Sequence, residues 1–380
     1  MNGARHKSTP LPSQNKLEPS SRQWRVRVAL ELTFCADQTI MPYSYWHTDP
    51  FLSERNAQRM LRIAETFGRF GTYAEEASCD GLGETLPQRF DAALNYISHG
   101  IDGSGNGESF EVAARRTNYF RETYAYGDHQ KTPDIDAFMN DPGLLAAVYD
   151  MNGSQAVVPA IVFANLLVPG QELAMHTDVP EFRGLNRKNC PQWLLVCMHH
   201  SGLFDAWRIP ILTCVSWFGE SSGGAFTFYP DGAEGMRTSL PARHNSAVLL
   251  DTDSVFHGVE RVAPETTDLP VIEPGTLLSF CGDDAWQLER DGEVLAQYHW
   301  SDIRYSISWK GYCFADEAAH SLWRNNSDNL TIDRVLGVFE ADRKARHLDS
   351  IDALSPNDRA LAMVQRYIRF PAKQGSADSD

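Results

Sequence analysis

Residues 170–178 read Gly-Gln-Glu-Leu-Ala-Met-His-Thr-Asp. They follow the run Val157–Val168, which is rich in β-branched residues and ends at Pro169-Gly170, so the composition predicts a strand closed by a turn. His176 and Asp178 are two positions apart, and side chains with this spacing point to the same face of a strand. The stretch therefore predicts that one imidazole and one carboxylate face a common metal ion, with further ligands supplied from elsewhere in the chain.

Short apolar stretches separated by Gly and Pro continue after this motif. They are Trp193–Met198, Ile211–Phe218, Ala225–Tyr229, Ala247–Leu250, Leu277–Phe280 and Tyr305–Phe314. Many short strands punctuated in this way are typical of a sandwich or a jelly-roll. The expected fold class is therefore mainly β with flanking helices, built around a jelly-roll core.

The regions on either side of these strands predict helices and one further strand. An alternating apolar pattern at Trp24–Phe34 predicts a half-buried strand. Ser53 is the expected N-cap of the first helix, and Gly68 lies near its end. Residues 100–107 are rich in glycine but lack the Lys-Ser/Thr of a phosphate loop, so they predict an ordinary loop. The predicted helices are Leu52–Phe70, Leu86–Ile97, Asp134–Asp150, Ile332–Phe339 and Asp358–Ile368.

The predicted domain organisation has one core with appended segments. Polar composition at both ends predicts disorder there. The predicted parts are a disordered leader (1–22), an N-terminal α/β region packing on the core (23–155), the jelly-roll core (156–315) with an insertion at about 263–300, a C-terminal helical segment (316–372) and a disordered tail (373–380).

Of the twelve histidines, His257 is the best placed to complete a metal site with His176 and Asp178. It follows the β-run 247–250 and a polar turn, so it is expected on the next strand. Two imidazoles and one carboxylate on one face of an iron ion leave three coordination positions open. This arrangement suits non-haem Fe(II) oxygen chemistry.

Other chemically interesting residues have ordinary structural explanations. Adjacent histidines face opposite ways on a strand, which argues against a second metal pair. Basic residues next to aromatic ones favour a solvated helix face, with contact to an anionic substrate as the alternative. The adjacent pair is His199 and His200, and the basic set is Arg115, Arg116 and Arg121. His244 and His299 are expected at the surface or in the core. Core packing is expected for Trp193, Trp207 and Trp217, with lining of the substrate pocket as the alternative for one of them.

Four segments now stand in order along the chain. They are Pro169-Gly170-Gln171-Glu172-Leu173 with His176-Thr177-Asp178, then Gly223-Gly224-Ala225-Phe226-Thr227-Phe228-Tyr229, then His257, then Arg304-Tyr305-Ser306-Ile307-Ser308-Trp309. These segments resemble the His-x-Asp pair, the Gly-Gly-x-Leu-x-Phe strand, the distal histidine and the Arg-x-Ser strand of the Fe(II)/2-oxoglutarate-dependent dioxygenases. The resemblance covers about residues 165–312.

The resemblance implies a double-stranded β-helix, which is a cupin-like jelly-roll, and it implies roles for specific residues. It implies Fe(II) bound by His176, Asp178 and His257, and 2-oxoglutarate bound through its C5 carboxylate by Arg304 and Ser306. An arginine presents a planar fork that matches a carboxylate, and a hydroxyl on the same strand face adds a donor. With O2, the family forms succinate and CO2. Relatives that halogenate lack the carboxylate ligand, so the presence of Asp178 favours oxygenation.

The position of the arginine departs from the family pattern. Arg304 lies 47 positions after His257 (304 − 257), whereas the family's arginine usually follows closely. The segment 263–300 is interpreted as an insertion with room to cover the site. Arg261, four positions after His257, is the rival and lies on the same strand face, but Arg304 is preferred for its strand context and for Ser306. Asn165 is a further candidate for binding 2-oxoglutarate, and hydrogen bonding within the core explains it equally well.

Composition limits the classes of partner and compartment. A formal charge of −16 and a pI near 5.2 disfavour nucleic acid and anionic membranes as partners. Seven cysteines without CxxC or a regular framework indicate a reduced chain. No run approaches the length of a membrane span, and the N-terminus lacks the apolar region of a signal peptide. The chain is therefore expected in the cytoplasm, and a homodimer is one option.

The function predicted from the sequence is Fe(II)- and 2-oxoglutarate-dependent oxidation of an unactivated C–H bond in a small molecule, with hydroxylation as the expected outcome. Hydroxylation of a protein or peptide side chain is the alternative among enzymes and would call for an open groove beside the metal. A non-catalytic jelly-roll binding protein with a vestigial metal site is the alternative of another class.

Overall fold

The structure is a computed structural model that describes residues 24–25, 44–73, 89–99, 118–154, 156–266, 272–273 and 275–371. The predicted leader, the 100–107 loop and the predicted tail lie outside the described residues. So does the predicted strand at Trp24–Phe34, except for β1 (Trp24–Arg25).

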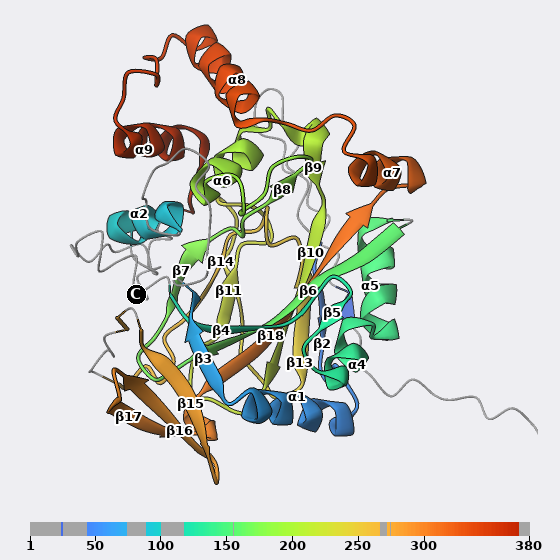
Figure 1. The fold of residues 1–380 in the computed structure, drawn as a ribbon, viewed down its shortest axis with the longest axis vertical. Coiled ribbons are helices and arrows are strands. Elements are labelled where there is room, and N and C mark those ends of the chain that lie inside the picture. Colours follow the sequence, from blue (N-terminus) through green and yellow to red (C-terminus); the bar gives the residue numbers. More distant parts are fainter. Residues whose placement is uncertain are drawn as a thin grey trace, which may run out of the picture.

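Two antiparallel sheets form the core of the molecule (Figure 1). The central strands of the larger sheet are, in order, β13 (Ser246–Leu250), β10 (Ile211–Phe218), β18 (Arg304–Phe314) and β6 (Ala156–Leu167). The smaller sheet has the order β12 (Thr238–Leu240), β11 (Phe226–Phe228), β14 (His257–Val259) and β7 (Leu173–His176). Apolar side chains of the two sheets pack together, including Trp217, Phe228 and Leu250. Taken along the chain, these eight strands pass repeatedly from one sheet to the other, which is a double-stranded β-helix.

Further strands extend the larger sheet at both edges. Beyond β6 it continues through β4 (Phe120–Tyr126), β3 (Arg69–Thr72), β15 (Leu277–Gly282), β16 (Ala285–Arg290) and β17 (Glu293–His299), with β5 (His129–Gln130) paired to β4. At the other edge, β2 (Trp46–Thr48) and β1 follow β13. A separate two-stranded sheet joins β8 (Glu181–Phe182) to β9 (Arg208–Ile209). Part of the predicted 263–300 insertion is therefore the β15–β17 meander, seen at the lower left of Figure 1.

One group of helices covers the outer face of the larger sheet. The helix α1 (Glu54–Phe67) begins at Ser53, whose side chain accepts a hydrogen bond from the Asn56 N–H, and it ends at Gly68 in the left-handed conformation (φ 67°). Its apolar side packs against odd-numbered residues of β18, including Tyr305 and Trp309. The short helix α4 (Asp136–Met139) and α5 (Pro142–Asn152) belong to the same layer.

A second helical group packs beside the smaller sheet. It consists of α2 (Phe90–His99), α6 (Gln192–Ser201), α8 (Ile332–Ala345) and α9 (Pro356–Tyr367), while α7 (Glu317–Asn325) follows β18. The prediction of a strand at Trp193–Met198 was wrong, because this segment lies inside α6. Every residue from Gln192 to Met198 is buried, so the segment lacks the polar face that would have revealed helical periodicity.

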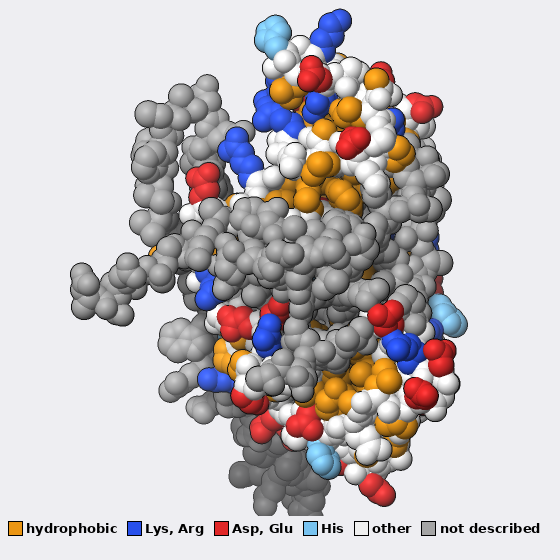
Figure 2. All heavy atoms as spheres, turned by 90° about the vertical axis from the view of Figure 1, so that its left-hand side faces the viewer, with side chains coloured by type: hydrophobic (Ala, Val, Ile, Leu, Met, Phe, Trp, Pro, Cys, Tyr) orange, Lys and Arg blue, Asp and Glu red, His pale blue; other side chains and the backbone are white. Residues whose placement is uncertain are grey.

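The surface is mixed in charge where it is described. On the face drawn in Figure 2, basic and acidic side chains are interspersed among apolar ones. No helix within the described ranges has the length and apolar character that crossing a bilayer requires.

Candidate metal centre and its cavity

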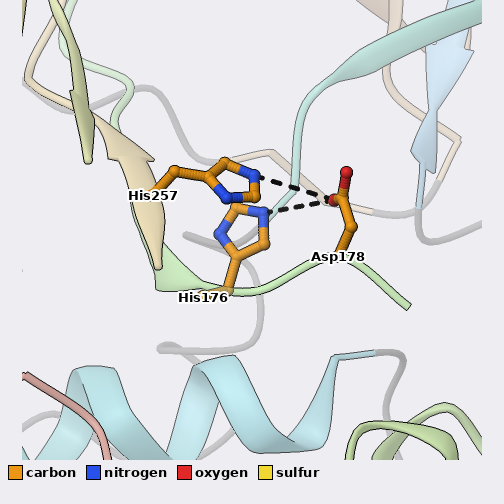
Figure 3. Close-up of side chains that lie close together, drawn as sticks. All are labelled: His176, Asp178 and His257. Carbon is orange, nitrogen blue, oxygen red and sulfur yellow. Dashed lines mark ion pairs between the residues drawn. The ribbon is translucent and has the colours of Figure 1, made fainter. Parts of the chain in front are cut away.

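The three predicted metal ligands form one cluster at the meeting of β7 and β14. The register of this pair places His257 opposite His176, and the two ring centroids are 4.4 Å apart. Asp178 follows the end of β7, and its Oδ1 lies 3.8 Å from His176 Nε2 and 3.7 Å from His257 Nε2 (Figure 3). All three ligand atoms lie within 4.8 Å of one another.

Backbone carbonyls orient both imidazoles. His176 Nδ1 lies 2.6 Å from the Ala174 carbonyl oxygen, and His257 Nδ1 lies 2.9 Å from that of Val255. A carbonyl can only accept, so each Nδ1 carries the proton and donates it. The Nε2 lone pairs are consequently free to bind a metal ion, and both face Asp178.

The protein environment favours the protonation states that a metal ion requires. Burial is the main factor that lowers the pKa of both His176 and His257, which keeps the imidazoles neutral. Burial alone would raise the pKa of Asp178, but Lys310 and the two imidazoles outweigh it, and the pKa lies well below the usual range. At neutral pH the cluster therefore offers two neutral nitrogens and one carboxylate.

Close packing of the backbone keeps the two ligand-bearing strands together. A Cβ on Gly258 would lie 2.8 Å from the carbonyl oxygen of Leu173 in β7, so a side chain at this position would push β14 away. Asp178 is held in turn by a hydrogen bond from its N–H to the Thr252 carbonyl oxygen, at 2.8 Å. Thr252 lies in the turn between β13 and β14, so this turn also leads to His257.

The cluster fits an iron ion by the chemistry of its donors. Within the described ranges it is the one group of three or more His, Cys, Asp or Glu side chains close enough together to hold an ion. Two imidazoles and a carboxylate are the ligands of non-haem Fe(II) centres with open positions.

Arg304 and Ser306 lie in the same cavity, which has a volume of about 420 Å³. Arg304 is only 2% exposed. Its Nε donates to the Gly224 carbonyl oxygen at 2.6 Å, and its Nη1 lies 3.3 Å from Ser306 Oγ. None of the acidic side chains in the described part of the chain forms an ion pair with it, and burial lowers its pKa to about 9. This buried guanidinium therefore lines the cavity and has no counterion within the described ranges.

The Gly223-Gly224 motif has a packing explanation. Gly224 has φ +65°, and a Cβ there would lie 2.6 Å from Arg304 Cδ. Glycine is needed at position 224 because the backbone is left-handed and because a side chain there would overlap the aliphatic part of Arg304.

The rival arginine and the asparagine occupy different surroundings. Arg261 lies outside the cavity that contains the cluster, and its Nε is 3.6 Å from Glu172 Oε2. Asn165 lies on β6 opposite Ser306 and lines the cavity. Its Nδ2 donates to Ser308 Oγ at 3.2 Å, while its buried Oδ1 has no hydrogen-bond partner among the described residues.

A further part of the cavity wall combines aromatic and basic side chains. Tyr73 stacks on Tyr119 with centroids 5.0 Å apart and an interplanar angle of 5°. The Arg121 guanidinium lies 3.8 Å from the Phe163 ring centroid, and Lys188 Nζ lies 4.5 Å from that of Tyr126. The segments 118–126 and 179–188 thus supply much of this wall. None of the described residues of 263–300 lines the cavity, so the structure gives no support for a covering role of that segment.

Several other candidates have positions that differ from the sequence-based expectation. Arg121 lies on β4 and is 8% exposed, so its placement on a solvated helix face was wrong. Arg115 and Arg116 lie outside the described residues. His199 and His200 lie on α6, not on a strand; their Nε2 atoms are 2.9 Å from Ser254 Oγ and 3.1 Å from Thr177 Oγ1, respectively.

The remaining candidates lie away from the cavity. Trp193 and Trp217 are buried in apolar clusters and Trp207 packs beside one of them. His244 accepts a hydrogen bond from the Gly219 N–H, and His299 is exposed.

Known proteins similar to this chain are found among solved structures. No family model matches the sequence, and no curated protein matches it either. Among solved structures, a prolyl-4-hydroxylase from Pseudomonas putida is 11% identical, with 72% of this chain and 94% of that chain covered and a TM-score of 0.34. The α-ketoglutarate-dependent carbocyclase SnoK of nogalamycin biosynthesis is 12% identical, covering 76% and 90%, with a TM-score of 0.37. An oxidoreductase of the 2OG-Fe(II) oxygenase family from Burkholderia pseudomallei is 12% identical, covering 51% and 68%, with a TM-score of 0.29.

At these identities and TM-scores, the similarity assigns no chemistry to this chain. The chemistry rests on the His176, Asp178 and His257 cluster and on the cavity around it.

Proposed function

We propose that this protein is a non-haem Fe(II)/2-oxoglutarate-dependent oxygenase that hydroxylates an unactivated C–H bond of a small molecule. The observation that carries the proposal is the presence, in one cavity, of the three-ligand cluster and of a buried arginine that has no counterion in the part of the chain that the structure describes. A metal-binding cluster alone would suit many functions. A carboxylate-binding group in the same cavity points to an acidic cosubstrate that reaches the metal.

Each residue then has a definite task. His176, Asp178 and His257 hold the metal ion, and the neutral imidazoles and ionised carboxylate need no proton transfer before they bind it. Arg304 and Ser306 bind the C5 carboxylate of 2-oxoglutarate, and Asn165, which lies opposite Ser306, can donate to the cosubstrate through its Nδ2. When bound, Fe(II) and 2-oxoglutarate supply the oxidation: one O2 gives succinate and CO2 from the cosubstrate, and a hydroxyl group on the substrate carbon.

The size and walls of the cavity favour a small molecule over a protein side chain. A volume of about 420 Å³ lies within the usual range for small-ligand sites. Beyond the cluster, the walls provide tyrosines for an apolar body and basic groups for polar substituents. A cytoplasmic location and a homodimer remain predictions.

Anaerobic calorimetry tests the proposal directly. Fe(II) should bind the wild-type protein with one site, and 2-oxoglutarate should bind the Fe(II)-loaded protein. His176→Ala should lose Fe(II) binding while keeping the same circular dichroism spectrum. A wild-type protein that binds neither Fe(II) nor 2-oxoglutarate would be a jelly-roll without this activity. Succinate formation with small organic compounds, compared with peptides, then tests the substrate class.

A further inference from the structure

Lys310 forms an ion pair with the carboxylate ligand. Its Nζ lies 2.8 Å from Asp178 Oδ2, and its side chain is 16% exposed. The other oxygen, Oδ1, is the one that faces the two histidines. One oxygen of Asp178 thus contacts Lys310, and the other faces the two histidine ligands.

The strand β18 explains how the lysine reaches this position. The side chains of four β18 residues at two-residue intervals line the same cavity: Arg304, Ser306, Ser308 and Lys310. At about 3.3 Å per residue, Lys310 is about 20 Å along the strand from Arg304. The lysine therefore lies at the end of the cavity away from the arginine.

A series of alternating acidic and basic side chains contacts Lys310 on the side away from Asp178. Its Nζ is 3.9 Å from Asp253 Oδ1, and Asp253 is fully buried. Arg208 Nη2 lies 3.9 Å from the other oxygen of Asp253 and 2.7 Å from Asp251 Oδ2. Asp251 and Asp253 belong to the turn between β13 and β14, whose Thr252 binds the Asp178 N–H. The lysine is thus anchored to the same turn that precedes His257.

A lysine ammonium group donates strong hydrogen bonds to a carboxylate. At 2.8 Å, Lys310 Nζ therefore occupies Oδ2 of Asp178.

Carboxylates bind metal ions through one oxygen or through both. Ligation through both oxygens of Asp178 would occupy four of the six coordination positions of the metal ion and leave two open. A chelating 2-oxoacid and O2 together need three. We propose that Lys310 is a positioning residue that reserves one oxygen of Asp178 for the metal ion by holding the other. This inference rests on the proposed function.

Replacement of Lys310 by methionine tests the inference through binding of 2-oxoglutarate. In anaerobic titrations, Fe(II)-loaded Lys310→Met should bind 2-oxoglutarate about 10- to 100-fold more weakly, a size typical of partners of metal ligands. The visible absorption that Fe(II) shows when chelated by a 2-oxoacid should weaken in parallel. Fe(II) itself should still bind, because all three ligands remain. Lys310→Arg should bind 2-oxoglutarate like the wild type, since it still donates to Oδ2.

Two controls separate positioning from general damage. Lys131→Met removes a surface lysine that pairs with Glu122, and it should change nothing. Lys310→Met leaves Asp253 buried without its lysine, so the double variant Lys310→Met/Asp253→Asn removes that charge as well. If the double variant regained wild-type affinity, the loss would come from the orphaned Asp253 and the inference would be overturned.

The outcomes distinguish the inference from the function beneath it. A wild-type protein that binds no Fe(II) or no 2-oxoglutarate overturns both. A wild-type protein that binds both, with a Lys310→Met variant of equal 2-oxoglutarate affinity and equal absorption, overturns the role of Lys310 alone.

Discussion

Replacing Arg304 by methionine should weaken 2-oxoglutarate binding and leave the empty protein at least as stable as the wild type. The guanidinium is buried with no counterion among the residues that the structure describes, and burial lowers its pKa from the ordinary value to about 9. This difference corresponds to a free-energy cost of about 5 kcal/mol for keeping the charge in the empty cavity. Methionine keeps part of the apolar stem and removes that cost. The Gly224 carbonyl loses its donor, which costs about 1–3 kcal/mol, so the balance favours the variant.

The bound state should respond in the opposite direction. A carboxylate that loses its buried charged partner typically loses about 2–5 kcal/mol, which is a rise in Kd of about 30-fold to more than 1,000-fold. Calorimetry of the Fe(II)-loaded proteins measures the Kd, and thermal unfolding without ligand measures stability. Arg261→Met is the matched control, because Arg261 pairs with Glu172 outside the cavity.

Two results would refute this reasoning. If Arg304→Met bound 2-oxoglutarate within about twofold of the wild type, the arginine would not be the carboxylate anchor. If Arg261→Met alone lost the affinity, the rival assignment would be correct. A merely structural Arg304 would show a lower melting temperature in the variant and an unchanged Kd.

Three further predictions concern glycines and a buried acid. Gly224→Ala should raise the Kd for 2-oxoglutarate about 10-fold or more in calorimetry, because the new Cβ would lie 2.6 Å from Arg304 Cδ. The control Gly153→Ala has the same left-handed φ, but its Cβ would meet nothing within 4 Å. It should lose about 1 kcal/mol of stability in urea unfolding through backbone strain and keep the wild-type affinity. Gly258→Ala should weaken Fe(II) binding about 10-fold by separating β14 from β7, and equal affinities for it and for Gly337→Ala in calorimetry would contradict this view of the strand pair. Asp253 has a pKa raised to about 7 by burial, so the folded state holds an extra proton between about pH 4 and 7 and stability should fall as pH rises through that window. Asp253→Asn should flatten this part of the curve of melting temperature against pH, and an unchanged slope would show that Asp253 does not titrate there.

The sequence was most informative where the chemistry depends on local spacing. His176 and Asp178 could be paired from the two-residue repeat of a strand, and His257 from a β-run followed by a turn. The two histidines then turned out to be register partners, which no local pattern could show. Strand pairing across a long loop decides which arginine lies in the same cavity as the metal ligands. The sequence alone therefore preferred Arg304 but kept Arg261 as the alternative.

The errors have physical reasons as well. The run Trp193–Met198 is apolar on all sides, so it carries no periodicity that separates a buried helix from a strand. Arg121 was assigned to a solvated helix face, although it lies on a strand that reaches the cavity. Lys310 was overlooked, because its partner Asp178 is 132 positions away. The pattern that could have revealed Lys310 is the series of polar residues at every even-numbered position from Arg304 to Lys310.

That series has a consequence for how the protein can change. Even-numbered residues of β18 face the cavity, while Tyr305, Ile307 and Trp309 face the apolar core under α1. Deleting or inserting one residue within the strand would exchange the two sets, placing three bulky apolar groups in the cavity and a guanidinium and an ammonium in the core. Point substitutions in β18 can therefore alter the site gradually, but a change in its length would destroy the site and the fold in a single step.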